Sequence, residues 1–270
     1  ILLTIKKNLE SSRLVDEKIT KGYQQEFRNI SLQLSSNLSF HEWFQVYKKI
    51  IYWELELSKS NDSSIDEIIS MQKSEANSQF FRFVSSNYQD WINNIESPLL
   101  SHNLLEKKVF PLLNSSSPVY LLLIDNLRYD QWKVIEDNLL KKFKIIDDSM
   151  YMSILPTATQ YSRNSIFSGL RPSEIQNLYP EKWLNDEDEG GKNMFEEDFL
   201  KDQIKRLHLQ NNKSSYTKIT NIDYGRKVIN KIDNMKHNNL NVIVYNFVDM
   251  LSHARTEMKV IKELADDDSA

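Results

Sequence analysis

The sequence contains no cysteine, and this absence excludes disulfide bonds and metal sites built on thiolates. Any bound metal must therefore rest on histidine and carboxylate side chains. A chain without cysteine fits a reducing compartment, and we expect the protein to be cytoplasmic. The sequence also lacks an apolar run of the roughly 18 residues that a membrane span needs, and it contains no signal-peptide pattern.

Charge of one sign is not in large excess either, since the net charge is −4 and the pI is about 5.8. This balance argues against broad electrostatic binding of duplex nucleic acid, although it does not exclude a local basic pocket.

The chain contains many aromatic residues for a hydrophobic core, with 12 Phe, 12 Tyr and 5 Trp among its 270 residues. That length is sufficient for one large domain or two ordinary ones. Because the chain begins with Ile1 and ends in ADDDSA, we expect it to be a piece of a longer protein.

Residues 1–113 show no convincing strand and are expected to form a helical bundle. Apolar residues recur at helical spacing in three stretches, the last of them ended by Pro98. Ser39, followed by Glu42 three residues later, is the signature of a capping box at the start of the second helix. A bundle at this place is typical of a spacer or of a dimerisation element, and the sequence leaves both alternatives open.

The polar segment Asn114 to Pro118 indicates a linker, and after it the pattern is that of an α/β domain, residues 118–270. The run VYLLLI (119–124) is expected to be a central parallel strand covered on both faces, and Asn241 to Val248 a second one. The other expected elements are strands within 143–155 and 215–220, helices at 128–142, 160–168, 195–207 and 224–235, and an irregular acidic stretch within 174–201. Such alternation predicts a doubly wound, mostly parallel sheet, in which ligands bind at the carboxyl ends of the strands.

The stretch LPTATQYSRNSIFSG (155–169) combines a strand end, a turn with two hydroxyl groups and the start of a helix. Thr157 and Thr159 would then lie at a helix N-terminus, whose free N–H groups and partial positive charge suit a phosphate or an oxyanion. The same pattern is also that of an ordinary N-cap, because threonine satisfies the first N–H groups of a helix. By itself the stretch favours the cap, and a nucleophilic hydroxyl needs support from other residues.

Two carboxylates supply that support, since Asp125 directly follows VYLLLI and Asp249 directly follows NVIVYNFV. Both are expected at the same edge of the sheet as Thr159, where a carboxylate costs free energy unless it is paired or bound to metal. His253 follows Asp249 at i+4, and an Asp–His pair suits zinc, manganese or iron. Two divalent ions about 4 Å apart would activate the threonine hydroxyl for phosphoryl transfer. Each of these residues alone also has an ordinary role in turns and caps.

Three segments resemble the leading motifs of the PglZ domain, a member of the alkaline phosphatase superfamily. They are IDNLRYD (124–130), LPTATQYSRNSIFSGLRP (155–172) and NFVDMLSHAR (246–255). The similarity extends from Pro118 to the end of the chain. The helical part, which opens with ILLTIKKNLE, resembles the segment that joins a receiver domain to PglZ in PorX-type response regulators of Bacteroidetes. Those regulators are associated with type IX secretion.

The resemblance implies a role for each candidate residue. Asp125 would bind one zinc ion, and Asp249 and His253 would bind the other. Thr159, rather than Thr157, would be the nucleophile that bridges toward the metals. A threonine nucleophile implies hydrolysis of phosphomonoesters or phosphodiesters, nucleotides among them, because the sulfatases of this superfamily need an oxidised Cys or Ser.

The resemblance leaves the role of Arg163 open between holding a phosphate and forming a structural ion pair, and it favours a structural role for Arg128. The superfamily completes its two-metal site with an Asp–His pair and one further His, from strands beyond the end of this sequence. The receiver domain expected upstream is also missing. We therefore expect an incomplete site in this chain, which binds zinc weakly and hydrolyses little.

The resemblance as a whole implies the output module of a two-component response regulator with a zinc-dependent phosphodiesterase or phosphatase domain. A receiver domain in cis, regulatory protein partners and a homodimer are further expectations. The alternative is a non-catalytic regulatory or protein-interaction module whose metal site is structural or vestigial. A third alternative is a plain α/β domain whose acidic residues are only caps.

Overall fold

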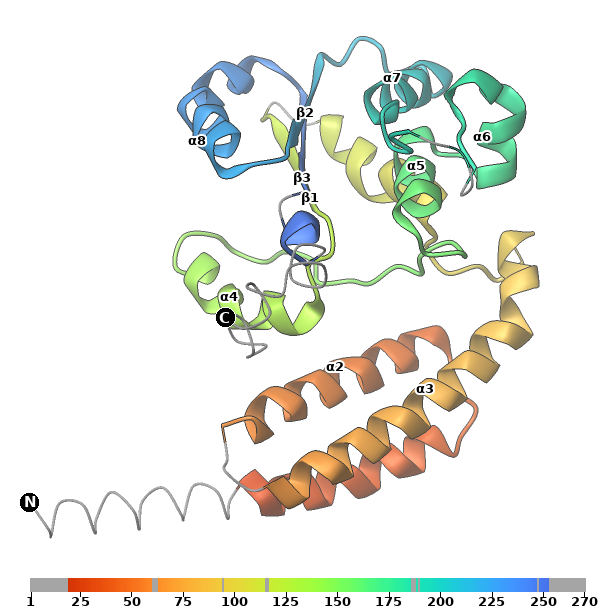
Figure 1. Ribbon diagram of the computed structural model, residues 1–270, viewed down its shortest axis with the longest axis vertical. Helices are drawn as coiled ribbons and strands as arrows, with labels where there is room; N and C mark the ends of the chain where they lie inside the picture. The colour runs from red at the N-terminus through yellow and green to blue at the C-terminus, as the bar shows by residue number, and fades with distance from the viewer. Residues whose placement is uncertain are drawn as a thin grey trace, which may run out of the picture. The chain divides into compact units, whose positions relative to one another are not determined.

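The chain forms two compact units in a computed structural model (Figure 1). The helical unit comprises residues 1–98 and 129–150, and the sheet unit comprises residues 99–128 and 151–270. The structure describes residues 19–59, 63–93, 95–114, 117–185, 188, 190–246 and 248–252. The chain first passes from the helical unit to the sheet unit between residues 98 and 99, ahead of the linker signal at 114–118. Among the described helices, none is long and apolar enough to cross a bilayer.

Three helices form the main part of the helical unit, as the sequence predicts. They are residues 19–34, α2 (Phe40–Leu57) and α3 (Ser63–Ile92). The predicted capping box at the start of α2 is confirmed. The Ser39 Oγ atom accepts a hydrogen bond from the Glu42 N–H at 3.4 Å, and the Glu42 carboxylate accepts one from the Ser39 N–H at 2.8 Å.

Aromatic side chains fill the space between these helices. The Trp43 ring lies 5.2 Å from the Phe80 ring and 5.9 Å from the Phe83 ring, measured between centroids. Gly22 allows the first helix to approach Trp53, since a Cβ atom at Gly22 would lie 3.0 Å from the indole ring. Close approach is therefore the reason for a glycine inside this helix, where glycine costs about 1 kcal/mol relative to alanine.

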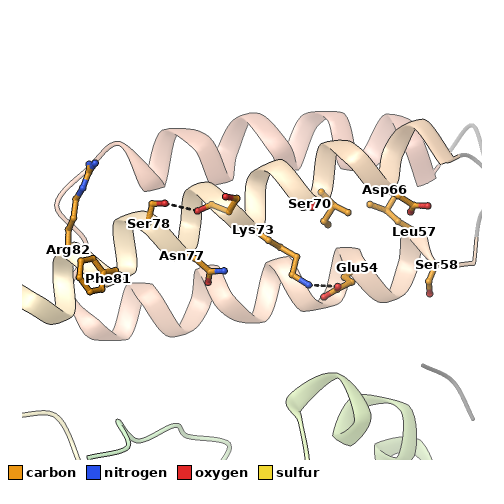
Figure 2. Close-up of a pocket in the computed structure, with 12 residues that line it drawn as sticks. Glu54, Leu57, Ser58, Asp66, Ser70, Lys73, Asn77, Ser78, Phe81 and Arg82 are labelled. Atoms are coloured by element: carbon orange, nitrogen blue, oxygen red, sulfur yellow. Dashed lines mark hydrogen bonds and ion pairs between the residues drawn. The ribbon is translucent and has the colours of Figure 1, made fainter. Parts of the chain in front are cut away.

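An open groove with a volume of about 1100 Å³ runs along α2 and α3 (Figure 2). Most of the residues that line it are polar or charged, and Lys73 of α3 forms an ion pair across it with Glu54 of α2. Phe81 lies at one end of the groove and Leu57 at the other. The two helices are thus joined by a charged pair along this face, whereas their apolar contacts lie on the core side.

The helix α4 (Tyr129–Leu140) also belongs to the helical unit and confirms the helix predicted at 128–142. The Tyr129 ring lies 5.8 Å from the Tyr47 ring of α2, and Lys48 forms an ion pair with Asp148 at 2.9 Å. α4 has no buried residue among the described ones.

The strand predicted within residues 143–155 does not form. Phe143, Ile145 and Ile146 are exposed, so their apolar pattern does not reflect burial in a sheet. Further along, Met152 makes a single isolated bridge to Leu100, with its N–H donating to the Leu99 carbonyl at 2.8 Å. One bridge cannot propagate into a ladder, and residues 153–158 run on in irregular conformation to the next helix.

The sheet unit contains three parallel strands, β1 (Val119–Ile124), β2 (Ser214–Ile219) and β3 (Leu240–Tyr245), in the order β1-β3-β2. β1 and β2 pair with β3 in the same register, so Ile124, Tyr245 and Ile219 are level at the carboxyl edge. β3 is the central strand, as predicted, but it ends at Tyr245 and not at Val248.

β1 departs from its predicted place. In the described sheet it is an edge strand, and Leu122 at its centre has 64% of its surface exposed. The continuous apolar run VYLLLI predicts burial on both faces, but here only one face of β1 is well covered. Apolar composition alone does not distinguish an edge strand from a central one.

Helices lie on both faces of the sheet (Figure 1). On one face, α5 (Thr159–Ser168) and α7 (Glu196–Arg206) pack their apolar side chains on alternate residues of the strands. On the other face, α8 (Ile222–Asn230) and the short helix η5 (Ile232–His237) cover Ile219 and Ile243. The α/β fold with a parallel sheet is therefore confirmed, along with the helices predicted at 160–168, 195–207 and 224–235.

Shorter helices complete the sheet unit. They are η1 (Ser101–Asn103), η2 (Leu105–Val109), η3 (Phe110–Asn114), α6 (Pro172–Leu178) and η4 (Pro180–Lys182). η1 packs on α5, and the Ser101 hydroxyl oxygen accepts a hydrogen bond from the Ile154 N–H, in the segment before α5, at 3.0 Å. The stretch within 174–201 is thus partly helical, because it contains the end of α6, η4 and the start of α7.

Candidate functional site

Two polar residues stand side by side at the carboxyl edge of the sheet. Asp125 directly follows β1, and Asn246 directly follows β3. The Asp125 N–H donates to the Tyr245 carbonyl at 3.1 Å, which extends the ladder by one residue and holds both residues in place. Because β3 ends earlier than the sequence predicts, Asn246 rather than Asp249 occupies the position beside Asp125.

Arg163 of α5 reaches this edge and is almost fully buried, with 3% of its surface exposed. Its Nη1 atom donates to Asp125 Oδ2 at 2.6 Å and to Asn246 Oδ1 at 2.5 Å. Its Nη2 atom lies 2.7 Å from the Glu196 carboxylate. Burial alone would lower the pKa of Arg163, but the charges of Glu196 and Asp125 outweigh it and raise this pKa. The guanidinium is therefore a permanent buried cation that joins two strands to two helices.

Glu196 at the start of α7 is the second buried member of this network, with 1% of its surface exposed. Its Oε2 atom accepts hydrogen bonds from Tyr216 Oη at 2.7 Å and from Lys218 Nζ at 3.1 Å, both on β2. Its Oε1 atom accepts one from Asn193 Nδ2 at 3.2 Å. Burial and the charge of Glu196 raise the pKa of Tyr216, so this phenol stays protonated.

The network is balanced in charge. Its cations are Arg163 and Lys218, and its carboxylates are Asp125 and Glu196. A buried charge is tolerated only when it is paired and hydrogen-bonded, and each of these four groups meets that condition. The arrangement is consequently stable as it stands, with the Asp125 carboxylate already engaged by a cation.

Thr159 is the first residue of α5, and its side chain is partly exposed. The N-cap position is Ala158, with no side-chain capping hydrogen bond, so the cap role that the PTxT pattern allows is not the one observed. The Thr159 carbonyl accepts a hydrogen bond from Asn193 Nδ2 at 3.1 Å. Arg163 follows one turn later, about 6 Å further along the helix axis. The predicted nucleophile and the buried guanidinium therefore share one face of α5.

Tyr151 adds a phenol to the same edge. Burial of its hydroxyl, together with the negative charge of Asp125, raises the pKa of Tyr151. The phenol is thus close enough to Asp125 to sense its charge, and it stays protonated at neutral pH.

The remaining predicted ligands are only partly described. Asp249 lies on the helical segment 248–252 and is partly buried, whereas His253 lies outside the described residues. Among the residues that the structure describes, no three His, Asp or Glu side chains come together as metal ligands would. The described donors therefore do not fit a zinc site by themselves, since Asp125 binds a guanidinium and the predicted histidine is not among them. Zinc remains a prediction from the resemblance.

A comparison with protein families decides what this architecture is. Residues 104–270, more than half of the chain, match the model of the BREX system PglZ alkaline phosphatase-like domain. The chain belongs to the PglZ family. Residues 13–92 match the PorX response regulator linker domain. Among curated proteins, none matches the chain significantly.

These matches confirm the resemblance found in the sequence and assign it to the two units. The PorX-type linker match covers the three main helices of the helical unit, and the PglZ match starts at residue 104, close to where the sheet unit begins. The combination is that of a response-regulator output module. The PglZ match contains the α/β sheet with its polar carboxyl edge and also residues 129–150 of the helical unit.

Sequence reasoning missed four residues of this edge, which are Tyr151, Glu196, Lys218 and Asn246. Of these, Lys218 left a readable signal. Tyr216 and Lys218 alternate on one face of β2, and a lysine on a core-facing side near a strand end needs a buried anion as partner. Glu196 left none, because an acidic residue in the first turn of a helix is ordinary on the surface as well.

Proposed function

We propose that the PglZ domain of this response-regulator output module hydrolyses phosphoesters, with Thr159 as the nucleophile. The observation that supports this most is the place of Thr159. Its hydroxyl lies in the first turn of α5, beside the carboxyl edge of a parallel sheet, and a buried cation follows on the same helix face. The dipole of α5 favours the negative charge of phosphoryl oxygens at this end of the helix.

The proposed reaction has two steps. The Thr159 hydroxyl oxygen attacks phosphorus, its proton passes to solvent, and the bond from phosphorus to the leaving oxygen breaks. The leaving alcohol takes up a proton, and water then hydrolyses the phosphothreonine to restore the hydroxyl. Arg163, held by Asp125 and Glu196, anchors α5 one turn beyond the attacking residue. Asn193 keeps the Thr159 backbone in place through the carbonyl hydrogen bond.

Zinc belongs to this proposal as the resident metal of the complete domain, with Asp125, Thr159, Asp249 and His253 as its ligands. When bound, zinc would supply Lewis-acid chemistry at the phosphoryl group. Elemental analysis of the complete protein, with Asp249→Ala beside it, tests this part. Two zinc ions per chain that fall with Asp249→Ala support it, and a metal-free active protein contradicts it.

The test of the nucleophile uses hydrolysis of an activated phosphodiester, bis(4-nitrophenyl) phosphate, by the complete protein. Thr159→Ala should abolish turnover, whereas Thr157→Ala should leave it near the wild-type rate. Thr157 is a matched control because it is a threonine in the same turn with an exposed side chain. Equal rates for wild type and Thr159→Ala would sink the proposal.

A second candidate function has a specific observation in its favour. The Asp125 carboxylate is already paired with Arg163, so this predicted zinc ligand has a partner within the protein. This favours a regulatory module that binds protein partners and performs no catalysis. Metal content without turnover, together with capture of a partner, would support that candidate over hydrolysis.

The setting of the module is also part of the proposal. We propose a receiver domain in cis, a cytoplasmic location, dimerisation through the helical unit and a role in regulating type IX secretion. The PorX-type linker match supports the receiver domain. The role in secretion rests on the resemblance in the sequence alone. Light scattering of the complete protein, with and without a phosphoryl donor for the receiver domain, tests dimerisation.

A further inference from the structure

Glu196 lies at the centre of the polar network, outside each of the motifs that carry the family resemblance. Four side chains donate to its carboxylate, from three different elements of the sheet unit. They are Arg163 of α5, Tyr216 and Lys218 of β2, and Asn193 from the segment before α7. Three of these donors bind Oε2 and one binds Oε1, and only 1% of the residue's surface is exposed. The carboxylate is therefore out of reach of an outside ligand, and it must act through the groups that it holds.

Two of those groups lead directly to the proposed nucleophile. Asn193 Nδ2 donates to Glu196 at 3.2 Å and to the Thr159 carbonyl at 3.1 Å, so it joins the carboxylate to the first turn of α5. Arg163, one turn further along the same helix, lies 2.7 Å from the Glu196 carboxylate through Nη2 and donates to Asp125 through Nη1. Glu196 therefore fixes α5 at two points, one at Thr159 and one at Arg163.

Stability alone does not account for a charged group in this place. A buried ion pair gains little over an apolar replacement of the same volume, because its desolvation offsets its attraction. What the charge of Glu196 does provide is a defined orientation of the guanidinium, because its N–H groups donate to acceptors at fixed positions. Lys218 Nζ, at 3.1 Å, balances the second charge and donates also to the Asn193 carbonyl at 3.1 Å, closing the loop around Asn193.

We propose that Glu196 is a positioning residue, which sets the Arg163 guanidinium and the Thr159 turn for phosphoester hydrolysis. The proposal rests on the proposed function, and it assigns Glu196 no contact with the substrate. Its loss should misplace the nucleophile without removing any group that reacts. A displacement of about 1 Å can cost about 100-fold in rate, so an effect on kcat of up to that size is expected.

The experiment compares Glu196→Gln with Glu197→Gln in the complete protein. Glu197 is a matched control, because it is the next residue of α7 but is exposed and pairs with Lys201 on the helix surface. The first measurement is amide hydrogen exchange of peptides that cover residues 157–168. Exchange there should rise about tenfold in Glu196→Gln and stay at the wild-type rate in Glu197→Gln, while peptides from α2 stay unchanged in both.

The second measurement is kcat and KM for bis(4-nitrophenyl) phosphate. Glu196→Gln should lower kcat with little change in KM. Arg163→Lys keeps the positive charge but cannot bridge several acceptors with a planar fork. If Glu196 acts through Arg163, adding Glu196→Gln to Arg163→Lys should lower kcat by less than it does in the wild type. Losses that simply multiply would overturn the proposal, as would an unchanged exchange rate in residues 157–168.

The two measurements separate the inference from the function on which it rests. If Thr159→Ala and wild type hydrolyse the ester equally, the proposed hydrolysis is wrong, and hydrogen exchange still decides whether Glu196 holds the α5 turn. If Glu196→Gln does not fold, Asn193→Ala replaces it, because Asn193 is only partly buried and carries the link to the Thr159 carbonyl. Unchanged exchange and unchanged kcat in Asn193→Ala would overturn the positioning role.

Discussion

The Nη1 atom of Arg163 lies 2.6 Å from the Oδ2 atom of Asp125. This ion pair joins the second turn of α5 to the end of β1, and it gives the carboxylate predicted to bind zinc a protein cation as its partner. The two roles of Asp125 share one group, so any metal bound there must share the carboxylate with Arg163 or displace it. In the structural interpretation Asp125 neutralises Arg163, whereas in the catalytic interpretation it binds zinc.

Asp125→Asn should lower the free energy of unfolding by about 2 kcal/mol. The amide keeps the shape of the side chain but removes one of the two negative charges that neutralise buried Arg163, and hydrogen bonds to charged groups contribute about 1.5–3 kcal/mol. Urea unfolding of the complete protein, followed by tryptophan fluorescence, measures the change. Asp137→Asn on the exposed side of α4 is the control and should change stability by less than about 0.5 kcal/mol. Equal effects of the two substitutions would contradict a role for the ion pair.

Local signals in the sequence predict most of the elements in this fold. The capping box at Ser39 and the apolar run at 119–124 gave an element start and a strand, because both depend on neighbours in the chain. The predicted strand within 143–155 failed, since Phe143, Ile145 and Ile146 in its first part are exposed and its second part makes a single bridge. Pairing with a distant strand decides whether such a segment becomes a strand, and the sequence does not record that partner.

The candidate site shows the same limit at the level of single residues. Asp125 and Thr159 were identified because each stands next to an element boundary that the sequence marks. Glu196 and Asn246 became visible only when the fold brought α7 and the end of β3 to Arg163. The predicted end of β3 lay three residues too late, at Val248 instead of Tyr245. Asp249 was therefore predicted at the carboxyl edge in place of Asn246.

Ser39→Ala should lower the free energy of unfolding of the helical unit by about 1 kcal/mol, because the Ser39 hydroxyl satisfies an N–H group at the start of α2. Thermal unfolding monitored by circular dichroism measures this change. Ser78→Ala is the control, since Ser78 is exposed within α3 and its hydroxyl bonds only to the carbonyl one turn before it. Alanine is the better helix former there, so Ser78→Ala should leave stability unchanged or raise it slightly. Equal destabilisation by both would show that the cap contributes nothing specific.

Gly169→Ala should lower the free energy of unfolding by about 3 kcal/mol. Gly169 ends α5 with a φ of 65°, a left-handed conformation that costs other residues about 1–2 kcal/mol, and crowding in a packed core adds about 1–3 kcal/mol. The crowding arises because a Cβ atom would lie 2.2 Å from the Nε2 atom of Gln203, a buried side chain.

The control for this substitution is Gly225→Ala in α8. A Cβ atom at Gly225 would lie 3.4 Å from the Ile219 side chain, an ordinary contact, and alanine favours the helix. Gly225→Ala should therefore raise stability by up to about 1 kcal/mol, so the two glycine substitutions should have opposite signs in the same urea titration. A loss of stability in both, or in neither, would mean that the left-handed cap at Gly169 is not what the substitution disturbs.

The sheet unit should lose stability as the pH falls below about 6.5, in part because of His102 in η1. Burial lowers the pKa of His102, and the nearby Glu174 and Glu106 oppose this shift while Arg171 adds to it. The folded state thus binds a proton less readily than the unfolded chain, so the contribution of His102 is fully present above the unfolded pKa. It is lost as the pH falls through the folded pKa. Urea midpoints between pH 7 and pH 5 should fall more steeply for the wild type than for His102→Gln. A His102→Gln slope equal to the wild-type slope would refute this assignment.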